Sequence, residues 1–199
     1  MGMTPYDPQQ SLDAARWRKA ERSRLLALRK SVPLAQRAQM DTKIIERLST
    51  RLNKPERIIG FYWPIQNEPD LRPLIKTLCD RGVVCALPVV VAKDAPLSFR
   101  CYSPGDQLEA GVWDIPIPVN GVEVLPDVLL APVVGFDHKG YRLGYGGGFF
   151  DRTMATLKPP PQLIGVGYEI ARVPTIFPQA HDKPADIIVT EASVVETDT

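Results

Sequence analysis

One apolar run limits the fold of this chain more than any other feature. Residues 127–136 read DVLLAPVVGF, almost without a polar side chain. Strands covered on both faces have such runs, and these strands lie in the middle of parallel sheets packed between helices. Shorter apolar segments of strand type occur before and after it, at residues 58–63, 83–91, 97–102, 163–168 and 187–195. We therefore predict a sheet with residues 127–136 at its centre.

Helical segments alternate with these strands. The residues and their spacing predict helices over 11–30, with Ser11 as a candidate N-cap, and over 34–52, 72–81 and 149–157, whereas 104–126 is rich in Pro and Gly and reads as irregular. Such alternation predicts an α/β fold: a single three-layer domain with a mostly parallel, mixed central sheet, Rossmann-like in type. We expect this domain to span residues 11–199 and residues 1–10 to form a flexible tail.

Charge and cysteine content narrow the class of protein. The 199 residues include 24 Lys and Arg and 23 Asp and Glu, which gives no global attraction to nucleic acid or membrane surfaces. Three cysteines without a CxxC pair, together with two histidines, argue against a zinc site. The N-terminus lacks the pattern of a signal peptide. We expect a cytoplasmic monomer that acts on small molecules.

The densest chemical signal is the stretch RLGYGGGFFDR at residues 142–152, where four of the five residues 144–148 are glycine. Glycines allow close backbone approach, so that successive N–H groups can surround an anion. A helix beginning at Phe149 would add its N-terminal N–H groups. Arg142 could clamp a phosphate, and Asp151 could hold Mg²⁺. The alternative is a glycine-rich turn without function, and no Walker A sequence is present.

The same stretch resembles the signature R-L-G-x-G-[KG]-G-[YF]-[YF]-D of the 5-formyltetrahydrofolate cyclo-ligase family. Four further segments resemble family segments and occur in the same order. They are FYWPIQNEPD at 61–70, WDIPIP at 113–118, PVVGFD at 132–137 and PQAHDKPADIIVTE at 178–191. The resemblance implies an enzyme that uses ATP and Mg²⁺ to convert 5-formyltetrahydrofolate into 5,10-methenyltetrahydrofolate, releasing ADP and phosphate. It also implies a three-layer α/β fold.

The resemblance implies the following site residues in this chain. Arg142 and Asp151 would be catalytic. ATP would be bound by Arg18, Lys19, Arg22, Arg142, Gly144, Tyr145, Gly146, Gly147, Gly148, Phe149 and Phe150. Folate would be bound by Trp63, Glu68, Tyr145 and Phe149, and Mg²⁺ by Asp151 and Asp186.

Several of these assignments have a plainer alternative. Residues 16–30 carry seven basic side chains and one acid, which is also typical of a solvated helix face. Glu68 could be an exposed loop acid, and Asp186 could cap a turn. Gly147 stands where many family members have a lysine, so the missing positive charge must come from elsewhere, and the basic segment 16–30 is one source. A paralogue that binds a reduced folate or a nucleotide without turnover is the alternative function.

Overall fold

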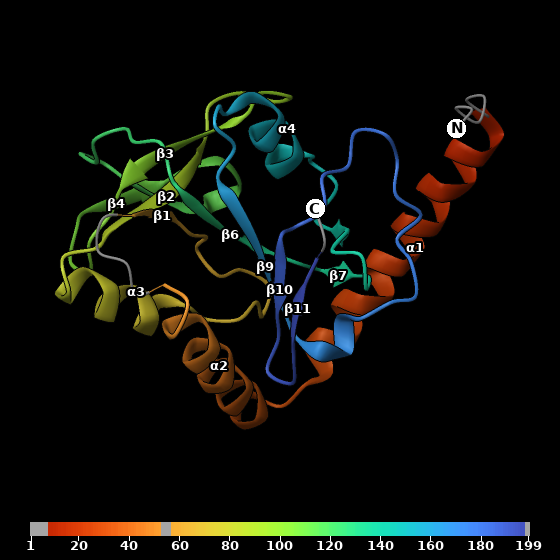
Figure 1. The fold of residues 1–199 in the computed structure, drawn as a ribbon, viewed down its shortest axis with the longest axis horizontal. Helices are drawn as coiled ribbons and strands as arrows, with labels where there is room; N and C mark the ends of the chain where they lie inside the picture. Colours follow the sequence, from red (N-terminus) through yellow and green to blue (C-terminus); the bar gives the residue numbers. More distant parts are fainter. Residues whose placement is uncertain (1–7, 53–56, 198–199) are drawn as a thin grey trace.

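The computed structural model describes residues 8–52 and 57–197, and its main element is a seven-stranded sheet (Figure 1). The strand order is β11-β10-β9-β6-β1-β2-β3. The bounds are β1 Ile58–Gly60, β2 Val84–Val90, β3 Leu97–Cys101, β6 Val128–Pro132, β9 Gln162–Val166, β10 Ile187–Val189 and β11 Val194–Glu196. The five inner strands are parallel, while β3 and β11 are antiparallel edges. The predicted mixed, mostly parallel sheet is confirmed.

The apolar run at 127–136 contributes strands to two sheets. Val128 to Ala131 are 0% exposed in β6, between β1 and β9. The chain then leaves the large sheet, and β7, Gly135–Phe136, pairs antiparallel with β8, Arg142–Leu143. The strand predicted over the whole run is therefore shorter. The predicted strand at 187–195 likewise divides into β10 and β11, because residues 190–193 turn between them.

Helices cover both faces of the sheet, which gives the predicted three layers. Figure 1 shows α2, Leu34–Ser49, and α3, Arg72–Asp80, on one side of the sheet and α4, Phe149–Thr156, on the other. The core under α2 and α3 includes Ile44, Leu48, Leu74, Leu78, Leu130 and Ile164. The core on the α4 side includes Phe99, Leu129, Phe136, Leu163 and Ile188.

Helix α1 spans Pro8–Ser31 and crosses the end of the molecule beside β7 (Figure 1). It begins three residues before the predicted N-cap, and Ser11 donates a side-chain hydrogen bond to Gln179. The expected tail boundary at residue 10 is corrected accordingly, since residues 8–10 are helical, and residues 1–7 lie outside the described part. Leu25 fixes the helix by packing on the β7–β8 hairpin.

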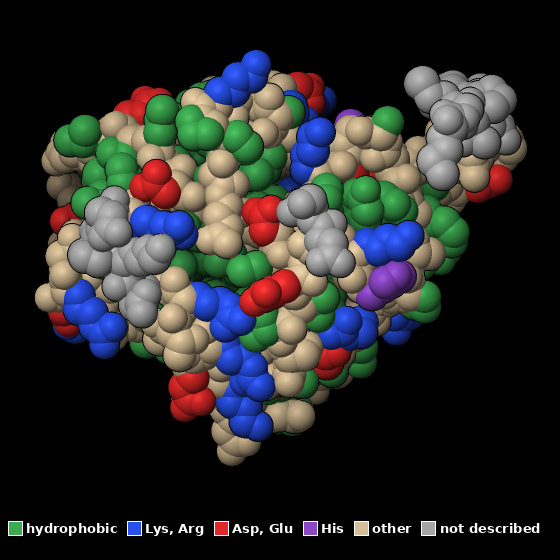
Figure 2. Space-filling model, in the orientation of Figure 1, with side chains coloured by type: hydrophobic (Ala, Val, Ile, Leu, Met, Phe, Trp, Pro, Cys, Tyr) green, Lys and Arg blue, Asp and Glu red, His purple; other side chains and the backbone are tan. Residues whose placement is uncertain are grey.

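The segment 104–126, predicted to be irregular, contains a small antiparallel hairpin. It is formed by β4, Leu108–Ala110, and β5, Pro116–Pro118, around a 3-10 turn at Val112–Asp114. A second 3-10 turn spans Glu169–Ala171. On the face shown in Figure 2, basic and acidic side chains are interspersed. In the described residues, no helix has the length and apolar character needed to cross a membrane.

Candidate functional site

The glycine loop, residues 144–148, leads directly into α4. Gly146 has φ +96° and Gly148 has φ +66°, and a side chain at either position would be strained in this left-handed region. Gly148 is the residue that caps α4, and Phe149 begins the helix as predicted. The loop follows β8, because the β7–β8 hairpin separates it from the central strand β6.

Two arginines, one from α1 and one from α4, donate hydrogen bonds to this loop. Arg22 of α1 donates from Nε to the Gly144 carbonyl oxygen at 2.6 Å. Arg152 of α4 donates from Nη2 to the Gly147 carbonyl oxygen, also at 2.6 Å, and its guanidinium lies 5.0 Å from the centre of the Phe149 ring. Arg22 was predicted from the sequence. Arg152 was missed, although its place in the first turn of a helix that follows a glycine loop is a usable signal.

Arg142 and Asp151 form an ion pair, which the sequence did not predict. Arg142 Nη2 donates to Asp151 Oδ1 at 3.0 Å, and Nη1 donates to the Lys183 carbonyl oxygen at 2.6 Å. The Lys183 N–H donates to the same Asp151 oxygen at 3.1 Å. Burial lowers the pKa of Arg142, and the charges of Asp151 and Asp182 oppose that change. Arg142 thus fixes the position of Asp151, and its guanidinium is inside the protein.

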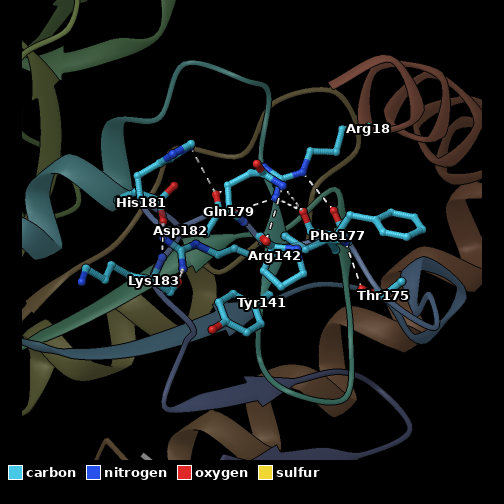
Figure 3. Close-up of polar contacts among 12 residues, drawn as sticks. Arg18, Tyr141, Arg142, Thr175, Phe177, Gln179, His181, Asp182 and Lys183 are labelled. Atoms are coloured by element: carbon cyan, nitrogen blue, oxygen red, sulfur yellow. Dashed lines mark hydrogen bonds and ion pairs between the residues drawn. The ribbon is translucent and has the colours of Figure 1, made fainter. Parts of the chain in front are cut away.

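Asp182 is the second acid beside this pair, and the sequence analysis missed it. Arg18 of α1 forms an ion pair with Asp182 and also donates to the carbonyl oxygens of Ile176 and Phe177 (Figure 3). Burial disfavours the ionised form of Asp182, but hydrogen bonds from Arg18 and the Gln179 N–H, together with the charge of Arg18, outweigh it, so the pKa of Asp182 lies below the ordinary value. A cavity of about 390 Å³ adjoins Arg18, lined by Ser11, Ala15, Arg18, Gln179, Ala180 and His181.

Asp186, which was expected to be a metal ligand, has a structural contact. Its Oδ2 accepts a hydrogen bond of 2.6 Å from the Leu163 N–H, at the amino ends of β9 and β10. In the described part of the chain, no hydrogen bond or ion pair joins Asp186 to Asp151 or Arg142. The alternative of a turn or strand cap therefore accounts for Asp186. Lys19 is exposed, and no side-chain contact within residues 8–52 and 57–197 joins it to the glycine loop.

Glu68 is buried, so the alternative of an exposed loop acid is wrong. It is 4% exposed, and Oε2 accepts a hydrogen bond of 2.8 Å from the Ile65 N–H across a turn in which Gln66 and Asn67 have positive φ. Its Oε1 accepts a hydrogen bond of 2.8 Å from the hydroxyl of Tyr145 in the glycine loop. Burial raises the pKa of Glu68 to about 7, although the hydrogen bonds of Ile65 and Tyr145 and the charge of Arg29 lower it.

The aromatic residues expected near folate lie at two places. Trp63 is half-buried, edge-on to Tyr102 and 5.3 Å from the Arg72 guanidinium. Phe149 and Phe150 pack partly on the core, and Phe149 meets the ring of Trp113 edge-on at 5.8 Å. Trp113 is 68% exposed with φ +58°. Trp113 thus presents an exposed aromatic ring beside the first residue of α4.

The acidic side chains near Arg142 limit which metal ion this site would hold. Within the described residues, no group of three or more His, Cys, Asp or Glu side chains is gathered as for a metal ion. Mg²⁺ needs fewer protein ligands, because one or two carboxylates suffice when substrate phosphates and waters complete its shell. Asp151 and Asp182, whose charges both act on Arg142, are the candidate carboxylates, although the Asp182 oxygens also accept hydrogen bonds from Arg18 and the Gln179 N–H.

Comparison with known proteins agrees with this geometry. A sequence profile of the 5-formyltetrahydrofolate cyclo-ligase family matches residues 14–191. The chain belongs to this family. It is 31% identical over 177 residues to the 5-formyltetrahydrofolate cyclo-ligase of Mycolicibacterium smegmatis, an alignment that covers 85% of this chain and 91% of that protein. It is 34% identical over 145 residues to the enzyme of the same name from Escherichia coli K12, covering 69% of this chain and 80% of that protein.

A solved structure supports the same assignment to the cyclo-ligase family. The NMR structure of Aquifex aeolicus 5,10-methenyltetrahydrofolate synthetase superposes with a TM-score of 0.79 at 29% identity, covering 92% of this chain and 93% of that one. The resemblance of the glycine-rich signature and the predicted α/β fold are thereby confirmed, and the chain is a member of an enzyme family.

Proposed function

We propose that this cyclo-ligase family member converts 5-formyltetrahydrofolate into 5,10-methenyltetrahydrofolate at the expense of ATP, with Mg²⁺ bound alongside the nucleotide. The observation that carries the proposal is the arrangement around the glycine loop. On one side lie Arg142, Asp151 and Asp182, and on the other side Tyr145 of the same loop contacts the buried Glu68. Phosphate chemistry and folate recognition would therefore meet at residues 144–148.

The phosphate groups of ATP would bind at the glycine loop. Its backbone, the amino end of α4 and the guanidiniums of Arg22 and Arg152 provide donors and positive charge in one place. The charge of Arg152, which donates a hydrogen bond to the Gly147 carbonyl oxygen, would replace the charge of the lysine absent at Gly147. The cavity beside Arg18 would accept the rest of the nucleotide.

The pterin ring would be held by Glu68. A carboxylate accepts two adjacent N–H donors, which the 2-amino-4-oxo edge of a pterin offers. Glu68 is fixed by its tight turn, so the ring would be oriented before reaction. Phe149 and Trp113 offer flat apolar surfaces on the loop side.

The reaction would need no nucleophile from the protein. The formyl oxygen attacks the γ-phosphorus of ATP, the bond from phosphorus to the β–γ bridging oxygen breaks, and ADP leaves. N10 then attacks the formyl carbon and loses its proton to solvent or phosphate. The carbon–oxygen bond breaks, inorganic phosphate leaves, and the N5–C–N10 methenyl bridge remains. The chain's task is to align the γ-phosphate with the formyl oxygen and to neutralise charge.

Asp151 and Asp182 would hold Mg²⁺, which in such sites neutralises charge on phosphate oxygens. Arg142 keeps Asp151 in place through its bond to Oδ1, and Arg18 keeps Asp182 ionised. All three cysteines are free thiols, which suits the reducing cytoplasm in which we place the enzyme.

The test is a coupled assay in which pure protein is mixed with ATP, 5-formyltetrahydrofolate and Mg²⁺. Methenyl absorbance and ADP should appear in equal amounts, and chelation of Mg²⁺ should stop both. Asp151→Asn should abolish most turnover while the far-UV spectrum stays unchanged. Folded protein that binds the folate in calorimetry but forms no product would instead support the non-catalytic paralogue.

A further inference from the structure

The Tyr145 hydroxyl lies between two buried charges. It accepts a hydrogen bond of 2.6 Å from Arg29 Nη2 and donates one of 2.8 Å to Glu68 Oε1. The direction of both bonds is fixed, because a guanidinium can only donate and an ionised carboxylate can only accept. The three residues come from distant parts of the chain, which are α1, the glycine loop and the turn before α3.

Arg29 is a buried arginine with few hydrogen-bond partners. It is 5% exposed, its Nη1 makes only a long bond of 3.4 Å to the Val133 carbonyl oxygen, and its Nε is buried without a hydrogen-bond partner. In the described residues, no direct ion pair joins Arg29 to Glu68. The hydroxyl is therefore the group through which this buried cation contacts the buried carboxylate. Unsatisfied buried donors are costly, so such a placement calls for a reason beyond packing.

We propose that Tyr145 is a positioning residue for Glu68, orienting its carboxylate toward the bound pterin and linking it to the Arg29 charge through one hydroxyl group. This inference rests on the proposed function. It differs from the role expected from the sequence, in which Tyr145 itself contacts ATP and folate. Because Tyr145 belongs to the glycine loop, its backbone would line the phosphate site while its side chain contacts Glu68.

The charged and titratable groups that face Glu68 come from three elements. Arg29 faces it from α1, Tyr145 from the glycine loop, and Tyr62 from the segment that follows β1. Asp41 of α2 and Tyr168 face Tyr62 behind it. Of these groups, Arg29 and Tyr145 lower the pKa of Glu68, while burial raises it. Removing the Tyr145 hydroxyl takes away one lowering contact and the hydrogen-bond link to Arg29, so the pKa of Glu68 should rise above about 7.

The experiment compares Tyr145→Phe with Tyr141→Phe. Tyr141 is also half-buried and near the loop, but no hydrogen bond to its hydroxyl is present in the described part of the chain. For each protein, kcat/KM for 5-formyltetrahydrofolate and for ATP is measured from pH 5.5 to 9. A hydrogen bond to a charged group typically contributes enough to shift a pKa by about one unit or more. The acidic limb of the folate profile should therefore move up by about one unit in Tyr145→Phe, with kcat/KM about tenfold lower at pH 6 and close to wild type at pH 9.

Tyr141→Phe should leave the profile in place, and ATP kinetics at pH 9 should change little in either variant. A pH-independent loss in Tyr145→Phe, or a profile that does not move, would overturn the proposal, because a purely structural role would lower activity equally at every pH. Wild-type protein without any turnover would instead refute the proposed function.

A double variant tests whether the Tyr145 hydroxyl acts on Glu68. In Glu68→Gln, no carboxylate remains to titrate, so adding Tyr145→Phe should cause no further shift in the pH dependence of folate binding, measured by calorimetry without ATP. If Tyr145→Phe still shifted the binding profile in the Glu68→Gln background, the hydroxyl would be acting on another group and the proposal would be wrong.

Discussion

Replacement of Glu68 by glutamine should change how the free energy of unfolding depends on pH. The ordinary pKa of this carboxyl is 4.5, and burial raises it to about 7 in the folded protein. A difference of about 2.5 units at 1.36 kcal/mol per unit corresponds to about 3 kcal/mol. Glu68 is 4% exposed, so screening by solvent reduces this figure little.

The sign of the effect follows from proton binding. The folded state holds the Glu68 proton more tightly than the unfolded state does, because its pKa is raised on folding. The stabilisation is therefore fully present below about pH 4.5 and is lost as the pH rises through about 7. Glutamine has no proton to lose. Relative to wild type, Glu68→Gln should thus be more stable at pH 8 than at pH 4.5 by up to about 3 kcal/mol.

The assay is urea unfolding of both proteins at half-unit steps from pH 4.5 to 8. Other titrating groups, including Asp41, whose pKa burial also raises, are common to both proteins and cancel in the difference. Glu46→Gln, at an exposed glutamate on α2, is the matched control and should give a flat difference. A flat difference for Glu68→Gln would refute the buried, high-pKa carboxylate and with it the basis for proton control at the folate side.

Three further predictions concern the phosphate side and the loop. Asp182→Asn should weaken Mg-ATP binding at least tenfold in calorimetry, whereas Asp186→Asn should leave it within twofold, since only Asp182 lies beside Arg18 and Arg142. Arg22→Met removes the guanidinium bonded to the Gly144 carbonyl, so KM for ATP should rise while folate binding stays close to wild type. Gly148→Ala places a side chain at φ +66° and should lower the free energy of unfolding by about 1–2 kcal/mol in urea unfolding.

The sequence predicted those elements whose signal is local. The buried strand at Val128–Pro132 and the helix beginning at Phe149 follow from an apolar run and from glycines before a helix. The end of β6 was not predictable, because residues 133–136 are as apolar as the strand, yet Gly135 and Phe136 pair with β8 and do not continue the large sheet. Apolar content indicates burial and does not say which neighbour covers the side chain.

The choice between the two acids of the closing segment needed the folded chain. Asp182 and Asp186 are four residues apart in the same stretch, and either could face Asp151 as far as sequence shows. Only the register of β9 and β10 brings the Asp186 carboxylate to the Leu163 N–H and leaves Asp182 with Arg18. Glu68 was unclear for a similar reason, because its burial depends on a turn with two non-glycine residues at positive φ.

The basic segment of α1 shows how one helix face can organise the whole site. Arg18, Arg22 and Arg29 are spaced by four and seven residues, so their side chains project from one face of the helix. Each reaches a different part of the site. Arg18 pairs with Asp182, Arg22 bonds to the Gly144 carbonyl of the glycine loop, and Arg29 contacts Tyr145 beside Glu68.

The interpretation of residues 16–30 as a solvated face is therefore wrong for these three side chains, although it holds for Arg16, Lys19 and Lys30, which are exposed. Because a helix is rigid about its axis, the rotation that Leu25 sets by packing on the hairpin places all three guanidiniums at once.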